Sequence, residues 1–187
     1  MKERKYKEDY ALEQYIDERG KEKRRAVYRG KWYRLRANAA EKKKLQLVSV
    51  LTCVAFAAVY LFYMKLSTPS AWCMYVLPVC AAGLIPLLYW AMGLFAMLRA
   101  PEKMTSIDKE NGIGRVMRSA MGCMILMGTA CVGDIIFMAR SGNFAAEWPG
   151  FMLILCACVI ALAGFRCVKD FYNHIQVLAN PEGGDQA

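Results

Sequence analysis

Four long apolar segments dominate the chain, and short polar stretches separate them. They comprise residues 45–64, 71–98, 119–139 and 148–168. About 20 residues of helix cross roughly 30 Å of hydrocarbon, and all four segments reach that length. Because a bilayer offers no water to satisfy backbone polar groups, each segment should be helical. The pattern predicts an all-α integral membrane protein built as a bundle of four transmembrane helices.

The second segment is longer than a straight crossing requires and contains three helix-disturbing residues, Pro78, Gly83 and Pro86. An interior proline removes a backbone donor and clashes with the preceding turn, so a kink is expected there. A bent but static helix is the favoured interpretation. The alternative is a hinge that moves in a transport cycle.

Residues 1–44 form a polar segment, and 16 of the 25 Lys and Arg residues precede Leu45. Its aromatic and apolar positions recur at near-helical spacing, interrupted by Gly20 and Gly30. This spacing predicts a basic amphipathic segment of two or three helical pieces. Residues 169–187 are expected to continue the fourth helix to Leu178, stop it near Pro181, and end in a loose tail.

The distribution of Lys and Arg predicts how the chain is oriented in the membrane. The basic segment, the loop 99–118 and the pair Arg166 and Lys169 together carry 23 of these residues. The opposite side carries only Lys65 and Arg140, within or beside short loops, the second of which is 141–147. Positive charge concentrates on the cytoplasmic side. A cell-membrane protein with both termini in the cytoplasm is therefore expected.

The basic segment has lipid as its first expected partner. Trp32 and Tyr33 are predicted to dip into the interface, and Lys42, Lys43 and Lys44 lie next to the first crossing. Each such charge contributes on the order of 1 kcal/mol near an anionic inner leaflet. A docking arm for a protein partner is the alternative. Nucleic-acid binding is not expected, because acidic residues are interleaved and no recognised module is present.

Asp134 is the only acidic residue well inside a predicted crossing. An ionised carboxylate at that depth costs a few kcal/mol, so it should be neutral, paired or in contact with water. One hypothesis is an ion or proton site in a small transporter or channel. The other is a structural hydrogen bond, with Thr52, Tyr60, Tyr63 or a backbone carbonyl as candidate partners.

Small residues on the third and fourth segments predict close helix packing, within the bundle or in an oligomer. They are Gly122, Gly128, Gly133, Ala157, Ala161 and Gly164. Met117, Met121 and Met124 share one helical face with Cys131, a set of soft ligands that would suit Cu(I). Methionine is also a common filler of apolar interfaces, and packing is the favoured role. No metal or other cofactor is predicted.

Catalysis is not expected. The sole histidine, His174, lies beyond the last crossing, and no second carboxylate accompanies Asp134 within the predicted spans. The leading hypothesis is a non-enzymatic accessory subunit or membrane-tethered scaffold, in a homo- or hetero-oligomer with another membrane protein. The alternative is a small ion- or proton-coupled transporter or channel that uses Asp134.

Overall fold

The computed structural model describes residues 9–16, 22–35, 39–66, 68–74 and 76–178. Its helices are α2 (Ala39–Lys65), α3 (Leu77–Ala82), α4 (Leu84–Arg99), α5 (Ser106–Lys109), α6 (Arg115–Ser141) and α7 (Phe144–Asn173), with a 3-10 turn at Pro69–Trp72 and a π-helical turn at Glu110–Gly114. The strands are β1 (Tyr10–Ile16), β2 (Glu22–Tyr28), β3 (Trp32–Leu35), β4 (Lys103–Met104) and β5 (Ile175–Leu178).

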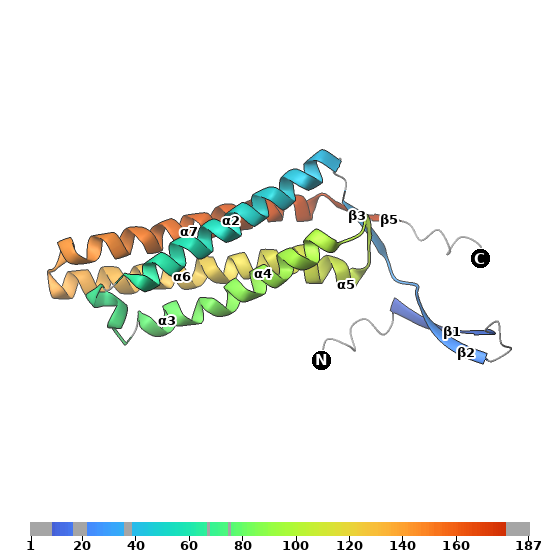
Figure 1. Ribbon diagram of the computed structural model, residues 1–187, viewed down its shortest axis with the longest axis horizontal. Coiled ribbons are helices and arrows are strands. Elements are labelled where there is room, and N and C mark those ends of the chain that lie inside the picture. Colours follow the sequence, from blue (N-terminus) through green and yellow to red (C-terminus); the bar gives the residue numbers. More distant parts are fainter. Residues whose placement is uncertain (1–8, 17–21, 36–38, 67, 75, 179–187) are drawn as a thin grey trace.

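Within the described residues, four helical stretches are long and apolar enough to cross a membrane, which agrees with the four predicted segments. They are Ala40–Lys65, Leu77–Arg99, Ser106–Ser141 and Phe144–Asn173. In Figure 1 the long helices run side by side along the longest axis of the molecule. Helix α6 packs against α4 and α7, and α7 also packs against α2. The chain is therefore a multi-pass bundle.

The bundle has two distinct ends. The strands β3, β4 and β5 lie at one end, which we call the strand end (Figure 1). The turn Pro69–Trp72 and the α6–α7 connection at Gly142 lie at the other, which we call the loop end. Gly142 has a φ of +68°, the left-handed conformation that glycine tolerates and that lets the chain reverse directly after α6.

The second crossing is interrupted where its prolines and glycine predict. Helix α3 ends at Ala82 and α4 begins at Leu84, with Gly83 between them. Pro86 has no N–H to donate to the preceding turn. A Cβ at Gly83 would lie 3.0 Å from the Cys80 carbonyl oxygen and 3.0 Å from Met127 Cε, so only glycine fits this junction without displacement.

The predicted helical pieces in the N-terminal segment are wrong. Strands β1 and β2 form an antiparallel hairpin in which Tyr10 pairs with Tyr28 and Ile16 pairs with Glu22. Tyr, Ile, Val and Trp are abundant here and favour strands. An alternation of period two over Tyr10, Leu12 and Ile16 competes with the near-helical spacing, and the strand is what forms.

The predicted continuation of the fourth helix to Leu178 is also wrong. Helix α7 ends at Asn173, and β5 pairs antiparallel with β3, so that Ile175 lies opposite Leu35 and Leu178 opposite Trp32. Strand β3 also pairs with β4, which follows α4. The β-branched side chains of β5 favour a strand, and the free edge of β3 offers it hydrogen-bond partners. Pairing with β3 therefore outweighs continuation of the helix. The predicted tail from 179 onward lies outside the described residues.

Apolar side chains fill the bundle and also cover its outside. Phe56, Trp90 and Met127 are fully buried between the helices. Large apolar residues on all four crossings are exposed, among them Leu51, Leu88, Phe95, Ile125, Val132 and Val159. A soluble monomer does not expose apolar surface on this scale, whereas hydrocarbon accepts it. The distribution supports a membrane location.

Candidate functional site

Asp134 lies in the interior of the bundle near its loop end, with 0% of its surface exposed. It belongs to α6, on the face that also buries Met127, Ala130 and Met138. Neither of its carboxylate oxygens has a hydrogen-bond partner of regular geometry among the described residues. The predicted bonds to Thr52, Tyr60 or Tyr63 are therefore not formed. Thr52 donates instead to backbone carbonyls of its own helix, and Tyr60 donates to the Cys80 carbonyl oxygen.

A second carboxylate lies beside Asp134. Glu147 is in the first turn of α7 and is 0% exposed, although the sequence analysis places it in a short connecting loop. Its Oε1 accepts a hydrogen bond of 3.1 Å from the backbone N–H of Ser70, while its Oε2 has no partner among the described residues. Asp134 interacts electrostatically with Glu147 and by side-chain hydrogen bonding with Ser70. Among the described residues Asp134 is therefore accompanied by a second buried carboxylate, which was not predicted from the sequence.

Three uncharged polar side chains complete the cluster, one each from Tyr63, Thr68 and Ser70. The Ser70 hydroxyl donates to Thr68 Oγ1 at 3.4 Å, and both residues are buried. The Tyr63 hydroxyl is buried without a hydrogen-bond partner among the described residues, and it interacts electrostatically with both carboxylates. Together with Asp134 and Glu147, these residues are called the carboxyl cluster below.

A glycine makes room for this cluster. A Cβ at Gly150, one helical turn beyond Glu147, would lie 2.9 Å from Thr68 Cγ2 and 3.5 Å from Tyr63 Cε2. The absence of a side chain there lets the turn Pro69–Trp72 close against α7. The carboxyl cluster is thereby sealed from the surroundings of the bundle.

No cation neutralises the cluster within the described part of the chain. The nearest basic residues along α2 and α6, Lys65 and Arg140, are exposed, and no salt bridge joins either to Asp134 or Glu147. The described residues also contain no group of three His, Cys, Asp or Glu side chains placed to hold a metal ion. The cluster thus combines two buried acids with only neutral polar neighbours.

The burial of Glu147 could have been predicted from the spacing of small and apolar residues along α7. The helix buries Glu147, Gly150, Ile154, Ala157, Ala161, Gly164 and Val168, at alternating intervals of three and four residues. The small residues Ala157, Ala161 and Gly164 mark part of this stripe. Extending it toward the N-terminus by the same intervals reaches Glu147.

The six predicted packing residues occupy different environments. Ala157 and Ala161 are fully buried. A Cβ at Gly164 would lie 2.9 Å from Trp90 Cζ2, and one at Gly122 would lie 3.3 Å from Pro86 Cβ. A Cβ at Gly128 would meet no atom within 4 Å in the described structure. Gly133 is half-buried on α6, next to Asp134.

The residues predicted to meet lipid lie at the strand end. Tyr33 is in β3, and Lys109 Nζ lies 4.4 Å from the centre of its ring and 4.6 Å from that of Tyr172. The Trp32 ring packs edge-on against Tyr28 at 5.1 Å. Each of these contacts is within the protein.

The three consecutive lysines at the start of α2 take different positions at the same end. Lys42 donates to the Ala100 carbonyl oxygen at 3.3 Å, Lys43 is exposed, and Lys44 lines a pocket.

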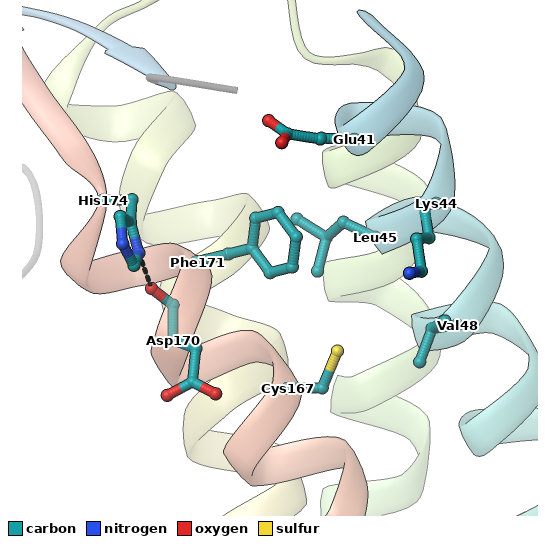
Figure 2. Close-up of a pocket in the computed structure, with 8 residues that line it drawn as sticks. All are labelled: Glu41, Lys44, Leu45, Val48, Cys167, Asp170, Phe171 and His174. Atoms are coloured by element: carbon teal, nitrogen blue, oxygen red, sulfur yellow. Dashed lines mark hydrogen bonds between the residues drawn. The ribbon is translucent and has the colours of Figure 1, made fainter. Parts of the chain in front are cut away.

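That pocket has a volume of about 410 Å³ and lies between α2 and α7 at the strand end (Figure 2). Charged and polar side chains line part of it, and apolar side chains the rest. The first group comprises Glu41, Lys44, Asp170 and His174, and the second Leu45, Val48, Cys167 and Phe171. Figure 2 shows the bond of 2.6 Å between His174 Nδ1 and the Asp170 carbonyl oxygen. The pocket is amphipathic and carries both signs of charge.

Comparison of the whole chain with models of protein families, with curated proteins and with solved structures finds no match.

Proposed function

We propose that this multi-pass membrane protein is a non-enzymatic accessory subunit or membrane-tethered scaffold, which docks a partner protein through its N-terminal hairpin. The observation that supports the proposal is the exposure of two large aliphatic side chains on β1. Leu12 is 72% exposed and Ile16 is 73% exposed. In Figure 1 the β1–β2 hairpin stands apart from the long helices.

The chemistry of the hairpin suggests the kind of partner. Tyr10, Leu12 and Ile16 share one face of the strand, because residues two apart point the same way. Arg24, opposite Gln14 in the register, lies on that face and is exposed. An apolar patch with an acidic rim on the partner would complement this face. Both outer edges of the two-stranded sheet are unpaired in the described structure, which also permits strand addition.

The arrangement of the rest of the chain is consistent with such a role. The connections at the loop end are short, so most of the polar surface belongs to the strand end. From the distribution of Lys and Arg, the strand end and both termini face the cytoplasm of the cell membrane. The partner would accordingly be met on the cytoplasmic side, close to an anionic leaflet.

The test uses the full chain purified from its native membrane in mild detergent, followed by native mass analysis. A stoichiometric foreign chain should accompany the wild type and be lost from Leu12→Ser/Ile16→Ser. Arg25→Gln, an exposed change on the opposite face of the hairpin, is the matched control and should retain it. A partner that remains bound to the double variant, or a chain that purifies only with itself, would contradict the proposal.

A second candidate function is a small proton- or ion-coupled transporter or channel. The specific observation that favours it is the burial of Glu147 beside Asp134, which provides two carboxyl groups inside one bundle. If this function holds, Asp134→Asn should abolish transport by the reconstituted protein while leaving its assembly intact. Exposed Asp170→Asn should leave transport unchanged.

A further inference from the structure

We propose that the carboxyl cluster is a proton-binding site, in which Asp134 carries the bound proton and Glu147 holds the turn Pro69–Trp72 through the backbone N–H of Ser70. The proposal does not depend on the docking function above, since it concerns the opposite end of the bundle. It also requires no transport, because a site can bind a proton without conducting one.

The two carboxyl groups differ in their hydrogen bonding, and the difference assigns their roles. Glu147 accepts the N–H of Ser70, and a donor of this kind stabilises the ionised form of a carboxyl group. Asp134 is equally buried, and neither of its oxygens has a hydrogen-bond partner of regular geometry among the described residues; the Ser70 hydroxyl interacts with Asp134 but donates to Thr68 Oγ1. A buried charge without partners is the least favourable state available to a carboxyl group, so Asp134 takes up a proton instead.

Protonation also improves the hydrogen bonding of the cluster. With both groups ionised, three buried oxygens would be acceptors without donors, namely Asp134 Oδ1 and Oδ2 and Glu147 Oε2. A proton on Asp134 turns one of these into a donor. The available acceptors are Glu147, which interacts with Asp134 electrostatically, and the hydroxyl oxygen of Ser70, whose side chain is within hydrogen-bonding reach of Asp134. One added proton thus removes an unpaired acceptor and one negative charge.

The surroundings favour a proton over other ligands. Asp134 is faced by Tyr63 from α2, Cys80 from α3, Cys131 from its own helix and Glu147 from α7. None of these groups is a cation. Tyr63 is 2% exposed, and its hydroxyl has no hydrogen-bond partner of regular geometry among the described residues, so it adds a buried neutral polar group beside the two carboxyl groups. Within the same residues there is no donor set for a metal ion.

Ser70 connects the site to the backbone that covers it. Its amide binds Glu147, and its hydroxyl binds Thr68, so the turn is held closed by the same cluster that binds the proton. Loss of the proton would leave two negative charges behind this turn. The expected consequence is a loosened turn between the first and second crossings.

The direct test is labelling of the intact wild-type protein in detergent with a hydrophobic carbodiimide, which reacts with protonated carboxyl groups, followed by mass analysis of the peptides. Asp134 should be modified near pH 6, and its modification should fall as the pH rises. Asp170, which is exposed, serves as the internal control and should not be modified by the hydrophobic reagent. Labelling of Glu147 in place of Asp134 would overturn the assignment of roles, and labelling of neither would overturn the site.

Two further measurements test whether the ligand of Asp134 is a proton. Asp134→Asn, which mimics the protonated form, should fold, and its melting temperature should lose the pH dependence that the wild type shows. If that variant does not fold, the labelling of the wild type alone decides the proposal. Protection of Asp134 from the reagent by sodium but not by choline would identify a metal cation as the ligand and overturn proton binding.

Discussion

The backbone N–H of Ser70 donates a hydrogen bond of 3.1 Å to Oε1 of Glu147, across 77 residues of sequence. This bond joins the turn between the first two crossings to the first turn of the fourth. Both residues are fully buried. The bond joins a buried amide to a buried carboxyl group, so loss of either partner would leave the other unsatisfied in an apolar interior.

Removing the acceptor should destabilise the bundle. Glu147→Ala leaves the Ser70 amide buried without a partner, at a cost of about 1–3 kcal/mol. For a chain of this size the melting temperature should fall by roughly 2–4 °C per kcal/mol, measured by thermal unfolding in detergent. Glu147→Gln keeps a carbonyl oxygen and should lose less. Exposed Glu102→Gln is the control, and an equal loss from it would refute the importance of the Ser70 bond.

Gly164 and Gly128 form a matched pair for testing helix packing. A methyl group at Gly164 would lie 2.9 Å from Trp90, whereas at Gly128 it would meet nothing within 4 Å of the described structure. Gly164→Ala should destabilise the protein by about 1–3 kcal/mol through overpacking. Gly128→Ala should be neutral or stabilise by roughly 0.5–1 kcal/mol, because alanine favours the helix. Equal melting temperatures for the two variants would count against this packing.

The pH dependence of stability follows from the proposed proton on Asp134. If the folded protein binds one proton more than the unfolded chain, stability must fall as the pH rises. The limiting slope for one proton is about 1.4 kcal/mol per pH unit, and it ends once Asp134 ionises in the folded state. The difference between the wild type and Asp134→Asn isolates this contribution from those of all other titratable groups. A difference that stays constant between about pH 5 and pH 9 would exclude such a proton.

The orientation predicted from Lys and Arg can be tested with epitope tags. A tag at either terminus should bind antibody only after the cells are permeabilised. A tag after exposed Gly142, at the loop end, should bind antibody in intact cells. The even number of crossings requires the two terminal tags to behave alike. Accessible termini on intact cells would reverse the orientation and remove the argument for cytoplasmic docking.

The features that were predicted correctly depend on residues close together in the sequence. Hydropathy and segment length predict the four crossings, and Pro78, Gly83 and Pro86 predict the interruption of the second. Helix α5 likewise begins at a local signal, a capping box in which Thr105 and Asp108 bond to each other's backbone N–H. In each case the responsible residues are neighbours along the chain.

The failures involve residues that are distant along the chain. The spacing of Ile175 and Leu178 predicts a continued helix, yet β5 forms because β3 supplies a strand edge. Leu12 and Ile16 fit helical spacing as well as strand spacing, and pairing with β2 selects the strand. Glu147 is predicted to be a loop residue, because the apolar segment begins only after it. It is buried because the packing face of α7 extends to its first turn.

Span number, span position and charge asymmetry depend on composition over windows of about 20 residues, so the sequence alone determines them. The meeting of Asp134, Ser70 and Glu147 depends on which faces of three separate elements turn toward one another. That choice comes from packing among small and large side chains, such as Gly150 against Thr68, and no local window contains it. The carboxyl cluster therefore emerges only once the helices are assembled.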